Sequence, residues 1–240
     1  MRSFPGPILL FHTTAYNRHT IGAQPVGTCL MRTRNLTEPG SWRGWDGREF
    51  NVSFANPYVL QHRGGDPRRH VCVPLKFPAV TAGREELIVQ GLVWSTYLKM
   101  FVAVIRVYCG KGPHGTYDGL GASPLMFSVS DDLMSWSALR PLYSPQPYAD
   151  WWVNYPTLLD PSAPARGDLN FETIGQTAVL YFSWAPQLHN WRSLVSVPVR
   201  FFLDTTVENS ENRTTLKTDD FEADDAANKH SCICTTFVPH

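Results

Sequence analysis

The sequence contains no long apolar run. A transmembrane helix needs about 18 or more consecutive apolar residues, and the longest core-like runs here are ILLF at residues 8–11 and MFVAVI at residues 100–105. We therefore expect no membrane partner. The N-terminal run is also too short for the apolar region of a secretion signal and has prolines beside it, so we interpret it as part of the folded domain.

The sequence has no excess of positive or of negative charge. Lysine plus arginine and aspartate plus glutamate number 21 each, so the chain as a whole has no field that attracts nucleic acid or anionic lipid. The balance is uneven along the chain, because residues 204–240 contain eight acidic and three basic residues. This region also has few large apolar residues, and we predict that it forms a polar, acidic and disordered C-terminal tail.

Cysteine is scarce and odd in number. The five cysteines are too scattered for a disulfide framework, and we expect most of them to be buried thiols: Cys29, Cys72, Cys109, Cys232 and Cys234. The last two lie in the polar tail without a second pair at zinc-finger spacing, so we expect no metal site and no cofactor. Three Asn-x-Ser/Thr sequons, at Asn35, Asn51 and Asn212, matter only if the chain is secreted, and the sequence leaves its compartment open.

Sustained helical periodicity is lacking as well. Short runs rich in Val, Leu, Ile, Phe, Tyr and Trp alternate with clusters of Gly, Pro, Asn, Asp and Ser, which is typical of an all-β protein. Apolar residues make up 43% of the chain and aromatic residues 12%, enough for a substantial core. We expect a tight hairpin turn with positive φ at Gly175, and strands at residues 8–11, 28–31, 87–94, 100–108, 125–129, 153–159, 177–184 and 194–202.

One glycine motif does not indicate a cofactor. Gly110, Gly112 and Gly115 spell G-x-G-x-x-G after a predicted strand, but Pro113 lies inside the motif and no helical pattern follows. A dinucleotide-binding turn must open into a helix, so we interpret this segment as a loop.

A weak internal repeat organises the strands. Residues 30–45 (LMRTRNLTEPGSWRGW) and 126–139 (MFSVSDDLMSWSAL) share a strand, a polar pair ending in Asn35 or Asp132, a leucine, and a tryptophan after a turn. Such a recurring unit is typical of the blades of a β-propeller. A β-sandwich built from unrelated hairpins is the alternative architecture.

Four longer stretches carry a family resemblance. GLVWSTYLKMFVAVI, MFSVSDDLMSWSALRPLYS, YPTLLDPSAPARGDLNFETIGQTAVLYFSW and SLVSVPVRF together resemble the last blades of the five-bladed β-propeller glycoside hydrolases of the family 43 type. The likeness covers roughly residues 8–202 and lies in the strand pattern, not in a catalytic signature. It implies a single propeller domain over residues 1–203, followed by the tail.

The first block of this domain lacks one expected part. Residues 8–12 and 27–32 pair naturally as the middle strands of a blade, but no inner strand precedes them. A five-bladed ring also needs more chain than this, at about 50 to 70 residues a blade. We therefore expect an incomplete propeller of about three to four blades, without one or two N-terminal blades.

The resemblance also implies a reaction. Glycoside hydrolysis uses two carboxyl groups, one that donates a proton and one that activates water or attacks directly, and in this family they lie near the heads of inner strands. Glu86 and Asp150 occupy such positions here and are our catalytic candidates. We predict that Trp152, Asn154 and Tyr155 bind the sugar, with strand alternation sending Asn154 to one face and Tyr155 to the other, together with Val153.

Two functions follow from these expectations. The first is a glycoside hydrolase-like protein that acts on a glycan or glycoside by acid and base catalysis. The alternative is a non-catalytic propeller that binds a carbohydrate or a protein through the same aromatic residues. The sequence leaves the sugar, the linkage and the oligomeric state open.

Overall fold

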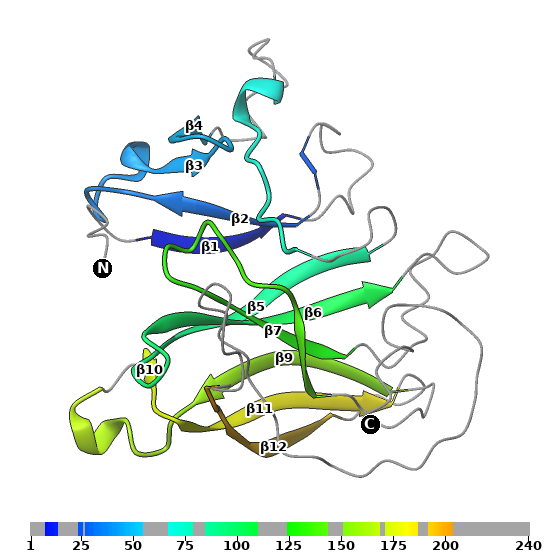
Figure 1. The fold of residues 1–240 in the computed structure, drawn as a ribbon. Helices are drawn as coiled ribbons and strands as arrows, with labels where there is room; N and C mark the ends of the chain where they lie inside the picture. Colours follow the sequence, from blue (N-terminus) through cyan, green and yellow to red (C-terminus); the bar gives the residue numbers. More distant parts are fainter. Residues whose placement is uncertain are drawn as a thin grey trace, which may run out of the picture. The chain divides into compact units, whose positions relative to one another are not determined.

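A computed structural model describes residues 8–13, 24–25, 27–54, 67–78, 85–109, 124–143, 151–168, 171–186 and 192–203. The described residues form an all-β fold, which confirms the predicted class. The strands are β1 (Ile8–Thr13), β2 (Gly27–Arg32), β3 (Arg43–Trp45), β4 (Phe50–Ser53), β5 (Glu85–Ser95), β6 (Met100–Cys109), β7 (Leu125–Ser130), β8 (Arg140–Tyr143), β9 (Trp151–Leu159), β10 (Thr173–Ile174), β11 (Thr177–Pro186) and β12 (Ser193–Arg200) (Figure 1). Three short 3₁₀ turns accompany them: η1 (Pro39–Ser41), η2 (Pro67–His70) and η3 (Pro164–Arg166).

The chain divides into two compact units. The first comprises residues 1–76 and 86–89, and the second comprises residues 77–85 and 90–240. Each predicted apolar run falls on one of the strands. No helix among the described residues is long and apolar enough to cross a membrane.

The first unit contains an antiparallel sheet of four strands in the order β1-β2-β3-β4. The predicted pairing of its first two strands is confirmed, with Leu10 opposite Leu30 in the register. Leu30 and the neighbouring Thr28 are buried, so β2 presents its residues to the core of this unit. Consecutive strands are neighbours throughout, which makes the sheet a simple meander.

A disulfide between Cys29 and Cys72 ties this sheet to the segment after η2, with the two Cα atoms 6.2 Å apart. The expectation of a buried thiol is therefore wrong for this pair. Their separation of 43 residues gave no sign that the chain returns to β2. The side chain of Gln24 holds the segment in place, because its Oε1 accepts from the backbone N–H of Cys72 at 2.9 Å and its Nε2 donates to the Cys72 carbonyl at 3.1 Å.

The second unit contains a sheet in the order β10-β5-β6-β7-β8. Strands β6 and β7 pair antiparallel, with Val104 opposite Phe127, and β7 is buried along its whole length. The sequence predicted β7 because four of its six residues are apolar. The short strand β10 adds to the other edge in parallel with β5.

A three-stranded sheet in the order β12-β11-β9 completes the second unit. It packs against the five-stranded sheet, and Figure 1 shows β9, β11 and β12 as a separate layer beside β5, β6 and β7. The core between the sheets contains fully or nearly fully buried side chains from both, including Val102, Val104, Phe127, Leu180 and Phe182. This core fixes the position of β9, the strand that carries the predicted sugar-binding residues.

The internal repeat is visible in the hydrogen bonds of two turns. The Oδ1 of Asn35 accepts from the backbone N–H of Thr37 at 3.1 Å, and the Oδ1 of Asp132 accepts from the backbone N–H of Met134 at 2.8 Å. In each turn a hydroxyl two residues earlier accepts the N–H of the Asn or Asp: Thr33 at 3.0 Å and Ser130 at 3.2 Å. Asp132 thus caps its turn through hydrogen bonds from the backbone.

The predicted hairpin at Gly175 is wrong. Its φ is not positive, and the positive-φ glycines of the described residues are Gly27, Gly47 and Gly167. The strand before it, β10, pairs with β5, whereas the strand after it, β11, pairs with β9 and β12. Gly175 therefore lies where the chain passes from one sheet to another, and a tight two-residue turn is not required there.

Several predictions concern parts of the chain outside the described residues. These are the glycine motif at 110–115, the sequon at Asn212, the cysteines and histidines of the tail, and the tail itself at residues 204–240.

Candidate functional site

A buried arginine contacts β9 at the predicted sugar-binding segment. Arg106 of β6 is 4% exposed, and its Nη1 donates a hydrogen bond to the Oδ1 of Asn154. Alternation places Arg106 on the same face of β6 as Val102 and Val104, which belong to the core. A guanidinium taken out of water needs partners for its N–H groups, so the bond fixes the orientation of the Asn154 amide.

Tyr155 follows directly and has an unusual backbone. Its φ is 54°, and the register between β9 and β11 shifts at this point, from Thr157 opposite Tyr181 to Asn154 opposite Ser183. The extra residue is a β-bulge, a feature that redirects a side chain. Tyr155 is 67% exposed, whereas Val153 two residues earlier is fully buried. The expectation that Tyr155 shares the face of Val153 is therefore wrong, because the bulge interrupts the alternation.

A second arginine lies over the exposed ring. The Cζ of Arg192, just before β12, is 5.8 Å from the centroid of the Tyr155 ring. This distance is within the range of a cation–π contact. The middle of β9 thus carries an exposed aromatic ring with Arg192 over it, next in sequence to an amide whose oxygen is bonded to a buried arginine.

The structure does not describe the side chains of the other three predicted residues. Trp152 lies in β9 opposite Ala185 in the register, and its side chain is outside the described part of the structure. Glu86 belongs to β5, and its side chain is likewise outside the description. Asp150 lies outside the described residues. Of the five predicted residues, the structure describes the side chains of Asn154, which is bonded to the buried Arg106, and of Tyr155, which is exposed.

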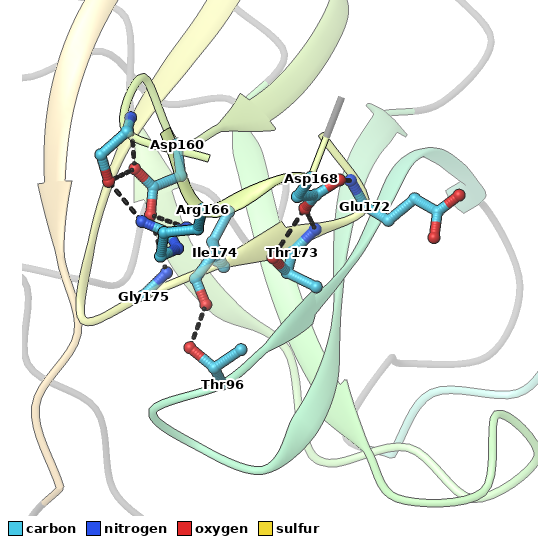
Figure 2. A network of polar contacts seen from close by, with 9 residues as sticks. Thr96, Asp160, Arg166, Asp168, Glu172, Thr173, Ile174 and Gly175 are labelled. Atoms are coloured by element: carbon cyan, nitrogen blue, oxygen red, sulfur yellow. Dashed lines mark hydrogen bonds and ion pairs between the residues drawn. The ribbon is translucent and has the colours of Figure 1, made fainter. Parts of the chain in front are cut away.

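Asp160 is a buried acid in the loop after β9, and Figure 2 shows its surroundings. Its side chain is 8% exposed and forms an ion pair with Arg166 at 2.9 Å. It also accepts from the backbone N–H and hydroxyl of Ser162, at 2.9 and 2.6 Å, and from the N–H of Gly175 at 3.2 Å. Burial raises the pKa of Asp160, but the hydrogen bonds and the charge of Arg166 outweigh it and lower the pKa to about 2.

Asp168 holds the other end of the same loop (Figure 2). Its Oδ2 accepts from the backbone N–H and the hydroxyl of Thr173 at 2.8 and 2.7 Å, and its Oδ1 accepts from the N–H of Glu172 at 3.1 Å. After this loop the chain pairs with β5 at Ile174. The carbonyl oxygen of Ile174 accepts a hydrogen bond from the hydroxyl of Thr96 at 3.0 Å. Asp160 and Asp168 are therefore structural acids that anchor the connection between the two sheets of the second unit.

The resolved pKa shifts of the described acids all point downward. The pKa of Asp46 is lowered by hydrogen bonds to its carboxyl group. For Asp132 and Asp160, burial raises the pKa, but hydrogen bonds outweigh it and the net shift is downward. A proton donor in glycoside hydrolysis needs a raised pKa, so these three acids do not suit that role. Within the described ranges no three His, Cys, Asp or Glu side chains are grouped as a metal site would require.

Sequence reasoning missed Arg106. The sequence does contain a sign of its role. Arg106 is the one charged residue in the strand MFVAVIRVYC, and strand alternation places it on the same side as two buried valines. A charge at a core position needs a buried partner, and the neighbouring sheet supplies Asn154.

Comparisons of the chain with protein-family models, with curated proteins and with solved structures found no match. The function must therefore be argued from the residues themselves.

Proposed function

We propose that the chain is a β-propeller domain that binds a glycan at Asn154 and Tyr155 in the middle of β9 and hydrolyses it through Glu86 and Asp150. The observation that carries the binding site is Tyr155, an aromatic residue that a β-bulge turns out into solvent beside Asn154. Exposed rings with polar neighbours suit the C–H faces and hydroxyl groups of a sugar. Arg106 keeps the Asn154 amide in one orientation, and Arg192 lies over the ring.

The strand connections support blades. In β5 to β8 each strand pairs with the next one in the chain, and β9 and β11 are likewise neighbours after the short β10. Propeller blades are meanders of this kind, whereas sandwiches commonly use Greek-key connections.

The space between the two sheets of the second unit widens from one side to the other, as the space between two propeller blades does. A methyl group added at Gly91 of β5 would lie 3.0 Å from the carbonyl oxygen of Pro156 in β9, so the backbones are in contact there. Sheets stacked as parallel layers are about 10 Å apart. Toward β7 and β8, aromatic rings fill the space instead: Phe127 with Phe201, centroids 6.1 Å apart, and Tyr143 with Phe182, 4.8 Å apart. Sheets that touch at one strand and diverge from it are the arrangement expected around a propeller axis.

The second candidate is a carbohydrate-binding propeller without hydrolysis. One observation favours it, namely that the resolved pKa shifts of the described acids are downward. It uses the same residues of β9 and requires neither Glu86 nor Asp150.

A glycan array followed by hydrolysis assays on the captured glycans tests both candidates. For the hydrolase, Glu86→Gln and Asp150→Asn each reduce the rate by about 10²- to 10⁴-fold, while binding persists. Glu172→Gln and Asp131→Asn, at exposed acids on other segments, are the matched controls. Binding without turnover in the parent supports the second candidate, and an empty array contradicts both.

A further inference from the structure

The turn between β2 and η1 carries an Asn-x-Thr sequon on the outside of the first unit. Asn35, Leu36 and Thr37 are all exposed, and Leu36 is 64% exposed. Nothing among the described residues covers this turn. Asparagine in Asn-x-Ser/Thr is the acceptor of N-linked glycans in secreted proteins, and surface loops are where they occur.

The hydrogen bonds of the turn leave the reacting atom available. The Oδ1 of Asn35 accepts from the backbone N–H of Thr37 at 3.1 Å and from its hydroxyl at 2.8 Å. The backbone carbonyl of Asn35 accepts from the hydroxyls of Thr33 and Ser41, each at 2.9 Å. In the described part of the chain no hydrogen bond involves the Nδ2 of Asn35, the atom to which a glycan is attached.

A separate observation in the same unit indicates the compartment. Cys29 and Cys72 form a disulfide, and Cys29 lies only six residues before Asn35. Disulfides persist in secreted proteins and in the lumen of the secretory pathway, and they are rare in the cytosol. The disulfide therefore favours an oxidising compartment, and the secretory lumen is the one in which sequons are glycosylated.

We propose that Asn35 is an N-glycosylation site of a chain that folds in an oxidising secretory compartment. The donor is an oligosaccharide linked to a polyprenyl diphosphate. The Nδ2 of Asn35 attacks the anomeric carbon, the N–C bond forms, and the bond from that carbon to the phosphate oxygen breaks. The polyprenyl diphosphate leaves with the electron pair, and one Nδ2 proton passes to a base of the transferase.

The second sequon of this unit is a poorer acceptor. Asn51 lies within β4 and not in a turn, and its Nδ2 donates to the Oε1 of Glu49 at 3.1 Å. The hydroxyl of Ser53 lies 3.5 Å from the Nδ1 of His70, and Val52 between the two is buried. We therefore expect Asn35 to be modified to a greater extent than Asn51.

The test is expression of the full chain behind a cleavable secretion leader in a eukaryotic host. Enzymatic deglycosylation in heavy-oxygen water converts a glycosylated Asn into labelled Asp. Trypsin then separates the two sites, because residues 35–43 form one peptide and residues 49–63 another. We expect label at position 35 in the parent and in Thr37→Ser, which keeps the sequon, and its loss in Thr37→Val.

A non-reducing peptide map of the same sample tests the disulfide between Cys29 and Cys72. An unlabelled position 35 in chain that has reached the lumen, whether secreted or retained, overturns the proposal. Label at position 51 that exceeds label at position 35 contradicts the structural ranking of the two sites. These readouts do not depend on the glycan-binding function proposed for β9.

Discussion

At the scale of single residues, Tyr155 combines strain with exposure. A non-glycine residue with positive φ costs about 1 kcal/mol or more, and Tyr155 has this conformation inside a strand, with its ring 67% exposed. Lys99 and Leu133, which also have positive φ, lie in turns where such a backbone is common. A strained residue that buries little surface contributes little to folding, so we attribute its placement to the ligand.

Substitutions of Tyr155 should change stability in opposite directions. Tyr155→Gly removes the strain and is expected to raise the unfolding free energy by up to about 1 kcal/mol. Tyr155→Val places a β-branched side chain in the same left-handed conformation and is expected to lower it. Chemical denaturation of the two variants and the parent measures both effects. A loss of stability in Tyr155→Gly as large as in Tyr155→Val would contradict the assigned backbone.

Asp160 provides a prediction about pH. Its folded pKa of about 2 lies below the ordinary value of 3.8, so the stability it contributes is present above pH 3.8 and is lost as the pH falls toward 2. At neutral pH, Asp160→Asn should cost about 1.5–3 kcal/mol through weakened charged hydrogen bonds. The difference from the parent should shrink below pH 4 in denaturation measured as a function of pH. A difference that is constant over this range would show that the charge of Asp160 is not what stabilises the loop.

The sequence predicted residue types better than residue geometry. It pointed to Asn154 and Tyr155 from their chemistry, and both lie in the middle of β9. It could not predict the bulge, because the extra residue is defined only by the register against β11. Arg106 was missed for a related reason, since its partner lies 48 residues away in another sheet.

At the scale of elements, Gly91 marks a close approach of β5 to β9, where an added Cβ would lie 3.0 Å from the Pro156 carbonyl oxygen. Gly91→Ala is expected to destabilise the chain by about 1–3 kcal/mol, because the added methyl group meets backbone that has no room to move. Gly40→Ala is the control, since a methyl group there has no atom within 4 Å. Thermal unfolding of both variants measures the effect. A tolerated Gly91→Ala would mean that the two strands are farther apart and would remove the support for a widening space between blades.

Strands were predictable from the sequence where they are long or fully buried. β6 and β7 are rich in apolar residues, and the sequence located both. The sequence missed four strands, which have four residues or fewer and are too short for a pattern to stand out: β3, β4, β8 and β10. The role of Gly175 was mistaken because β10 pairs with β5 and not with its neighbour in the sequence, a pairing that depends on tertiary structure.

At the scale of the whole molecule, the disulfide should affect one unit more than the other. It closes a stretch of 43 residues in the first unit, which the chain-entropy model equates with about 4 kcal/mol. In Cys29→Ala/Cys72→Ala, hydrogen exchange should accelerate in β2 and β3 and remain slow in β9 and β11. Hydrogen–deuterium exchange with mass spectrometry resolves these segments. Equal acceleration in both pairs of strands would contradict a division into two compact units.

A glycan bound at Tyr155 in the middle of β9 is the central proposal, and calorimetric titration of a captured glycan tests it most directly. The comparison is among the parent, Tyr155→Phe and Tyr155→Gly, because phenylalanine keeps the ring and glycine removes it without adding strain. We predict that Tyr155→Phe keeps most of the affinity and that Tyr155→Gly loses about tenfold or more, equivalent to about 1.4 kcal/mol. Equal affinity in all three proteins would show that the glycan does not bind at Tyr155.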